Sequence, residues 1–157
     1  MSKLTLMKIQ KAKGNGKKWT AIFKITENGE EELKERSFGY KNPDDPKNDY
    51  TLHQDKERRN RYIMRSKGHL KTGDPTRAGF LSMFLLWNKK TLKASVADYN
   101  KRLKEYNETG KFPTQDLIND AVEESLKKGG KTEEEVKNDK FVDKKNKQNS
   151  DIFKVDL

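Results

Sequence analysis

The sequence predicts an α+β fold in which a small antiparallel three-stranded β-meander is packed by several short helices. Three observations support this expectation: alternating apolar residues in one segment, glycine-containing turns on both sides of it, and helical stripes beyond residue 50. Within residues 18–26 the alternation has the period of two that is typical of a half-buried strand. The apolar side chains of one parity are Trp19, Ala21, Phe23 and Ile25.

Two glycine-containing links place further strands on either side of this segment. The link at residues 14–16 reads Gly-Asn-Gly and supplies the positive-φ residues that a tight hairpin needs. Residues 4–9 therefore form the expected first strand, although their alternation is less regular. The Asn-Gly pair at residues 28–29 is a second hairpin signal and leads to an expected strand at residues 33–40. Three strands with one apolar face need a covering layer.

Helical signals begin after a proline-containing loop. A helix is expected to start at Thr51, which has capping-box spacing, and to run to about Lys67. Gly68 can end this helix, and a connecting loop is expected over residues 68–76. Residues 78–87 are the most hydrophobic stretch and form the expected second layer over the sheet. Further helices are expected at residues 95–110 and 115–128.

The length and composition predict one domain with an appendage. The chain has 157 residues, and its hydrophobic content of 31% lies well below the ~45–50% of ordinary globular chains. Residues 1–130 are expected to form a single α+β domain. Residues 131–157 carry 7 basic and 7 acidic side chains and are expected to form an extended, charged C-terminal arm. We expect neither a signal peptide nor a membrane span, because no apolar run approaches ~20 residues.

The composition also narrows the chemistry. Because the chain has no cysteine, disulfide scaffolds, thiolate zinc sites and cysteine nucleophiles are excluded. His53 and Asp55 stand two positions apart, so on one helix their side chains would diverge rather than chelate a metal together. No serine–histidine–aspartate or phosphate-loop pattern is present. The protein is therefore expected not to be an enzyme and to hold no cofactor or metal.

Arginines form the strongest local signal. The net charge is +10, and five of the seven arginines lie within residues 58–77. On a helix Arg58, Arg61 and Arg65 would lie within about 60° of one another. Arginine binds carboxylate or phosphate in a bidentate manner. Because acidic residues are interleaved with these arginines, a structural network or a protein interface is favoured, and phosphate binding stays open as the alternative.

Two motifs resemble a known family. The first is Asp49-Tyr50-Thr51-x-His53-x-Asp55, continued by Arg58-x-x-Arg61-Tyr62-Ile63-x-Arg65; the second is Thr76-x-Ala78-Gly79-Phe80-x-Ser82, continued by Leu85-Leu86-Trp87-Asn88-Lys89 and Ser95-Val96-x-Asp98. Together they resemble a family of small proteins encoded by large nucleocytoplasmic DNA viruses of algae and protists. The similarity covers about residues 39–102. Leu81 and Lys90 depart from the family pattern, which often has an aromatic residue and a proline there.

The resemblance implies a viral protein without catalytic residues that could be carried over. Together with the small size and the basic charge, it favours a virion structural protein, a minor capsid protein that bridges or supports major capsid subunits. Its expected partners are the major capsid protein and other capsid components, and its expected locations are the capsid and, during assembly, the host cytoplasm. The alternative is a basic nucleic-acid-binding protein. The expected partner-binding residues are Arg58, Arg61, Arg65, Arg77, Trp87, Phe141, Ile152 and Phe153.

Overall fold

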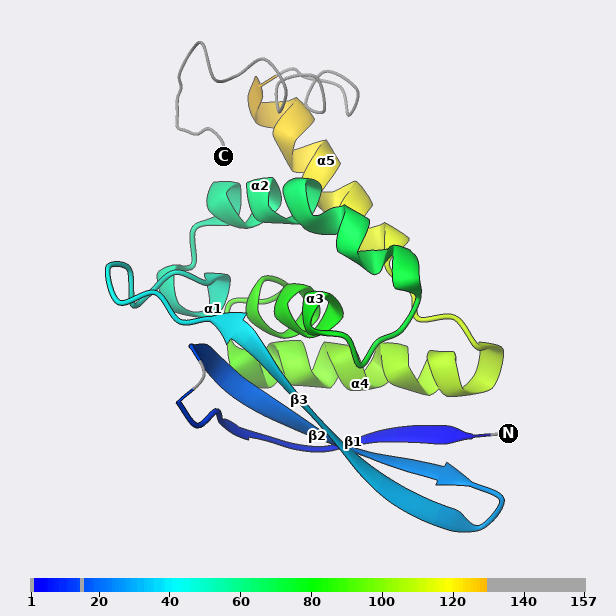
Figure 1. Ribbon diagram of the computed structural model, residues 1–157. Helices are drawn as coiled ribbons and strands as arrows, with labels where there is room; N and C mark the ends of the chain where they lie inside the picture. Colours follow the sequence, from blue (N-terminus) through cyan, green and yellow to red (C-terminus); the bar gives the residue numbers. More distant parts are fainter. Residues whose placement is uncertain (1, 15, 130–157) are drawn as a thin grey trace. The chain divides into compact units, whose positions relative to one another are not determined.

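A computed structural model describes residues 2–14 and 16–129 of the chain and confirms the α+β fold (Figure 1). The arm expected at residues 131–157 lies outside the described residues, and so do Phe141, Ile152 and Phe153. The strands are β1 (Lys3–Lys11), β2 (Lys17–Glu27) and β3 (Glu30–Tyr40). The helical elements are α1 (Tyr50–His53), α2 (Lys56–Ser66), η1 (Lys67–Thr72), α3 (Ala78–Leu81), η2 (Ser82–Leu86), α4 (Leu92–Thr109) and α5 (Gln115–Gly129).

The chain divides into two compact units. The first contains residues 1–54 and 69–113, which include the sheet, α1, α3, η2 and α4. The second contains residues 55–68 and the chain from residue 114 onward, which include α2 and α5. The single domain expected over residues 1–130 stays a prediction.

The sheet of the first unit is antiparallel with the order β1-β2-β3, as expected for a meander. Ala21 and Phe23 on β2 and Phe38 on β3 are fully buried. α3 and η2 contact β3, while α4 contacts β1 and η2, so all three helical elements cover the same side of the sheet (Figure 1). The apolar stretch at residues 78–87 is thus part of the second layer. The second half of that stretch, η2, is a π-helix rather than an α-helix.

A β-bulge explains why the alternation in β1 is irregular. The register with β2 shifts at Met7, between Leu6 and Lys8. Because a one-residue shift moves the following side chains to the other face of a strand, Ile9 shares a face with Leu4 and Leu6 despite its odd position. All three are paired with residues of the apolar parity of β2. Met7 itself is 50% exposed.

An aromatic cluster joins the sheet to the helical layer. The ring of Phe112 lies 5.6 Å from that of Phe80, 5.1 Å from that of Phe84 and 5.2 Å from that of Tyr99. Tyr99 in turn lies 6.5 Å from Phe23 on β2. Such tilted and edge-to-face pairs contribute about 0.5–1.5 kcal/mol beyond the area that they bury. The cluster therefore connects β2, α3, η2, α4 and the segment that follows α4.

Polar groups at the rim of the cluster are satisfied internally. The Tyr99 hydroxyl donates to the carbonyl of Pro75 at 2.8 Å, and burial raises the pKa of this phenol far above its ordinary value. Arg102 lies 4.8 Å above the Phe84 ring, and its guanidinium donates to Asp98 at 2.7 Å and to the carbonyl of Pro113 at 2.8 Å. These bonds let a phenol and a guanidinium sit in the core without the penalty for an unpaired buried group.

The expectation of one helix from Thr51 to residue 67 is wrong. Asp49 caps α1 by accepting from the backbone amide of Thr51, and Gln54 then adopts a left-handed conformation with φ 57° that ends α1. Asp55 begins a new helix because its carboxylate accepts from the amides of Glu57 and Arg58. Two aspartate caps therefore outweigh the capping-box spacing of Thr51.

Three other boundaries also differ from the expectation. The chain does not leave helical structure at Gly68 but continues as the 3-10 helix η1. α4 begins before residue 95, because the Thr91 side chain accepts from the amide of Ala94 and caps the helix there. β3 begins at Glu30 rather than at residue 33, since pairing with β2 extends to the turn. By contrast, α5 agrees with the helix expected at residues 115–128 to within one residue.

Gly39 allows β3 to approach the helical layer closely. Its φ is +85°, and a Cβ there would lie 2.8 Å from Leu86 Cδ1 and 3.3 Å from Lys18 Cβ. We expect Gly39→Ala to lower the free energy of unfolding by roughly 2–4 kcal/mol, because backbone strain adds to a clash with the core. Urea unfolding followed by circular dichroism measures this loss.

Gly29→Ala is the matched control for this substitution. Gly29 has a similar φ of +79°, but nothing lies within 4 Å of the position of its Cβ. Gly29→Ala should therefore lower the free energy of unfolding only by the backbone strain at positive φ, about 1 kcal/mol. Equal losses for the two variants would mean that the contact with Leu86 does not constrain the fold.

Candidate partner-binding surface

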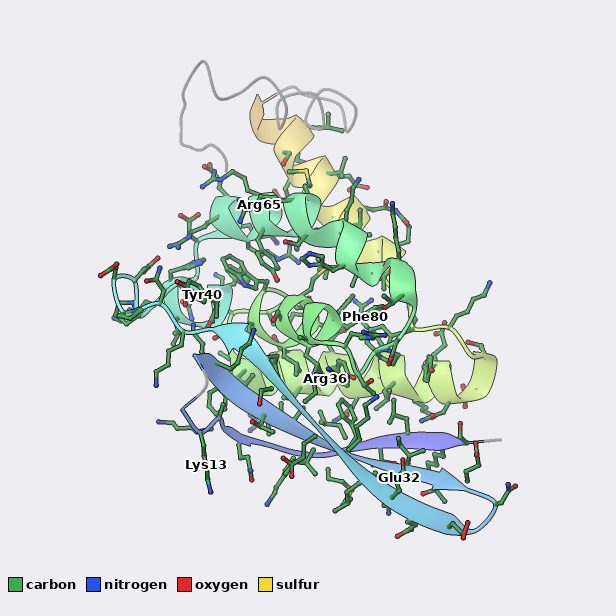
Figure 2. The ribbon with its side chains drawn as sticks, viewed as in Figure 1. Lys13, Glu32, Arg36, Tyr40, Arg65 and Phe80 are labelled. Atoms are coloured by element: carbon green, nitrogen blue, oxygen red, sulfur yellow. The ribbon has the colours of Figure 1, made fainter. Side chains whose placement is uncertain are left out.

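α2 carries four arginines in different environments. Arg59 is buried and Arg58 is half-buried, whereas Arg61 and Arg65 are exposed; Figure 2 labels Arg65 on this helix. All of them lie in the regular helix that Asp55 caps, so Arg58, Arg61 and Arg65 keep the common stripe that the sequence predicts. A stripe of this kind offers several guanidinium donors to a carboxylate or phosphate surface.

Arg59 is directed inward and binds an acidic residue of α5. Its Nη1 donates to Asp120 Oδ2 at 2.8 Å and to Asn60 Oδ1 at 2.8 Å, and Lys56 Nζ lies 3.5 Å from the same carboxylate. Burial acts to raise the pKa of Asp120, but the hydrogen bond and charge of Arg59, together with Lys56, outweigh it and lower the pKa. The pair joins α2 to α5, and the two helices pack against each other.

Arg77 lies in the first unit and has a different setting. Its side chain is 58% exposed, and its Nε lies 3.5 Å from Asp74 Oδ2. Asp74 also accepts from the amide and hydroxyl of Thr76, whose Oγ1 accepts from Lys34 Nζ at 3.1 Å. Burial opposes ionisation of Asp74, yet the bonds from Thr76 and the charges of Lys34 and Arg77 lower its pKa. Arg77 is therefore tied locally to an ionised carboxylate.

Trp87 ends η2 and is half-buried rather than fully exposed. Its ring lies 5.3 Å from that of His53, which lies 6.2 Å from the Tyr50 ring. Phe84, on the same element, is fully buried in the aromatic cluster. Of the two aromatic residues, only Trp87 thus has surface to offer to a partner. Its role as an anchor stays a prediction.

The sequence analysis missed a separation of charge along the sheet. Residues 2–26 contain seven lysines and no acidic residue, whereas residues 27–35 contain five glutamates. Counting charge over residues 1–40 as one segment gives 9 basic and 5 acidic groups and conceals this pattern. A count made strand by strand would have found it. Figure 2 shows Lys13 at one end of the sheet and Glu32 at the other.

Acidic and histidine side chains form no candidate metal site in the described part of the chain. Among residues 2–14 and 16–129, no group of three or more is placed to hold a metal ion. His53 lies at the end of α1 and Asp55 caps α2, so they belong to different elements. Likewise, no helix in this part of the chain combines the length and apolar content that crossing a membrane requires.

We predict that Asp120→Asn lowers the free energy of unfolding by about 1 kcal/mol at pH 7, because it leaves the Arg59 guanidinium without its carboxylate. The pKa of Asp120 is lower in the folded chain than in the unfolded one. Its stabilisation is therefore complete above the unfolded pKa and is lost as the pH falls through the folded pKa. The difference between wild type and variant should shrink below about pH 4 in urea unfolding measured across pH.

Glu31→Gln is the control for this prediction. Glu31 pairs with Lys24 at 3.5 Å, but both side chains are substantially exposed. Such a surface pair contributes little, so this variant should change stability by less than about 0.5 kcal/mol. If the Asp120 variant is no less stable than the Glu31 variant, the buried guanidinium does not depend on Asp120.

The comparisons with known proteins assign no family. No protein-family model, curated protein or solved structure matches the chain.

Proposed function

We propose that this protein is a virion structural protein, a minor capsid protein that bridges or supports major capsid subunits. The observation that carries the proposal is the arrangement of arginines on α2. Arg59 is used internally with Asp120, while Arg61 and Arg65 stand at exposed positions of the same helix. A helix that is held in place by a partly buried ion pair and exposes arginines is suited to an interface with an acidic protein surface.

Arginine is well suited to such an interface. Its planar guanidinium binds carboxylates in a bidentate manner, and it is enriched among residues that dominate binding energy. Arg58, Arg61 and Arg65 would pair with carboxylates of the capsid partner. Arg77 would add a contact from the first unit, where Asp74 already orients it.

Exposed apolar side chains also favour a protein that works in an assembly. Leu33 is 67% exposed, Tyr40 66% and Leu52 49%. Large apolar side chains are common at the buried centres of protein interfaces. In this proposal Trp87 is a further anchor, and Phe141, Ile152 and Phe153 anchor the C-terminal arm to neighbouring subunits. The protein would act without catalysis, in the capsid and, before that, in the cytoplasm of the host cell.

A basic nucleic-acid-binding protein, packaged in the virion or active in the infected cell, is the second candidate. The absence of acidic residues from residues 2–26 favours it. The two candidates differ in the partner that holds the protein in the particle. A capsid component remains with empty shells, whereas a genome-bound protein leaves with the nucleic acid.

The test is mass spectrometry of gradient-purified, nuclease-treated virions from the virus that encodes the chain. We expect the polypeptide in full particles and in empty shells, at a copy number that follows that of the major capsid protein. Its absence from purified particles would overturn the proposal. Its presence in full particles alone would favour the nucleic-acid alternative.

The arginines of α2 are tested by charge reversal. Arg61→Glu combined with Arg65→Glu should reduce incorporation into particles by roughly tenfold or more, because like charges then face the acidic partner. Lys101→Glu with Lys104→Glu makes the same charge change at two exposed positions of α4 and should leave incorporation unchanged. Quantitative immunoblotting of purified particles gives the comparison. Equal incorporation of both variants would exclude α2 as the interface.

A further inference from the structure

The β1–β2 hairpin is a purely basic element. All seven charged residues among residues 2–26 are lysines. Two of the seven are neutralised by acids elsewhere in the first unit: Lys18 binds Asp49, which caps α1, and Lys24 lies 3.5 Å from Glu31. The remaining five are exposed, namely Lys3, Lys8, Lys11, Lys13 and Lys17.

Four of these exposed lysines have no acidic partner within the described part of the chain. They are Lys3, Lys8 and Lys11 on the edge strand β1, and Lys13 in the hairpin turn. Figure 2 shows Lys13 at the tip, pointing away from α3 and α4. In the register of the sheet, Lys3 pairs with Thr26, so it lies at the other end of the sheet, beside the β2–β3 turn. Lys8 pairs with Ile22 and Lys11 with Trp19, so these two lysines lie on opposite faces of β1 and flank its edge near the hairpin turn.

Aromatic side chains lie at the same end of the sheet. Tyr40, at the end of β3, is 66% exposed and pairs in register with Lys17. Trp19 pairs in register with Lys11 and is half-buried. Residues directly opposite on neighbouring strands have side chains about 5 Å apart at Cβ, so an accessible ring stands beside a lysine.

The opposite end of the sheet has the opposite charge. Residues 27–32, at the β2–β3 turn, include four glutamates and no basic residue. The loop after β3 carries Lys41 and Lys47 against three aspartates, Asp44, Asp45 and Asp49, the last of which Lys18 binds. The potential of the sheet therefore directs an anionic ligand to the hairpin end and away from the β2–β3 turn.

We propose that the β1–β2 hairpin binds single-stranded nucleic acid, with the lysines on its phosphates and Tyr40 stacked on an unpaired base. Proteins that bind single strands combine a basic track with exposed aromatic rings in this way. Lysines on an edge strand also discourage pairing with another sheet, and the two roles are compatible. An anionic membrane is a poorer partner, because residues 12–16 at the tip hold no large apolar side chain to insert.

The experiment uses the full chain and a fluorescent single-stranded oligonucleotide, with anisotropy measured across salt concentrations. For wild type we expect an affinity that falls steeply as salt rises, with a log–log slope of about −0.7 per phosphate neutralised. Replacing Lys8, Lys11 and Lys13 with glutamine should weaken binding at least tenfold and reduce the magnitude of the slope by about 2. Arginine at the same three positions should preserve binding.

The matched control replaces three exposed lysines elsewhere in the same unit, Lys89, Lys90 and Lys93, with glutamine. It has the same net charge as the hairpin variant and should keep the wild-type slope. Tyr40→Ala should weaken single-strand binding roughly tenfold, leave the slope unchanged and have little effect on duplex binding. Thermal unfolding of each variant confirms that the fold is retained.

Three results would overturn the proposal. The first is no binding by wild type at 50 mM salt. The second is an equal loss in the hairpin and control variants, which would indicate that net charge alone acts. The third is a hairpin variant that keeps nucleic-acid binding but no longer binds vesicles containing anionic lipid, which would assign the lysines to a membrane. This experiment is independent of the capsid proposal, because it needs neither virions nor a capsid partner.

Discussion

The aromatic cluster around Phe112 is the interaction on which the first unit depends. Three strands with one apolar face are not stable alone, and this cluster supplies the layer that covers them. Tyr99 links α4 to Phe23 of β2, while Phe80 and Phe84 bring α3 and η2 onto the same centre. Gly39 lets β3 approach that layer without a steric clash.

The surplus charge is distributed by element rather than spread over the surface. The β1–β2 hairpin is purely basic, the β2–β3 turn is acidic, and α2 separates its arginines into one internal and several outward positions. Arg59 and Asp120 show how a charge is accepted inside: a hydrogen bond at 2.8 Å and a nearby lysine compensate for desolvation. The exposed Arg61 and Arg65 of α2 and the exposed lysines of the β1–β2 hairpin supply the two proposed binding surfaces. The net charge of +10 therefore understates how sharply charge is localised.

The sequence predicted an element correctly where one clear local pattern was present, and wrongly where two patterns fitted the same residues. The parity of β2 and the stripe of α5 could be predicted, because their periodic patterns are clear. The break between α1 and α2 could not, since it depends on two aspartate caps around a left-handed Gln54 that a capping-box spacing also fits. The bulge at Met7 could not be predicted either, because it is defined only by the pairing of β1 with β2. The inward direction of the Arg59 side chain could not be predicted, because its partner Asp120 lies on α5, more than fifty residues further along the chain.

Both proposed functions assign the binding of another macromolecule to charged surfaces of the described units. In a capsid the arginines of α2 would face protein. Carbodiimide cross-linking of intact, purified particles tests this most directly, because the reagent joins lysine amines to carboxylates, and Lys56 begins α2 while Lys67 follows its last residue. The account predicts cross-links from these two lysines to acidic surfaces of the major capsid protein. Cross-links from α2 only to genome-associated proteins, in particles that contain the chain, would contradict it.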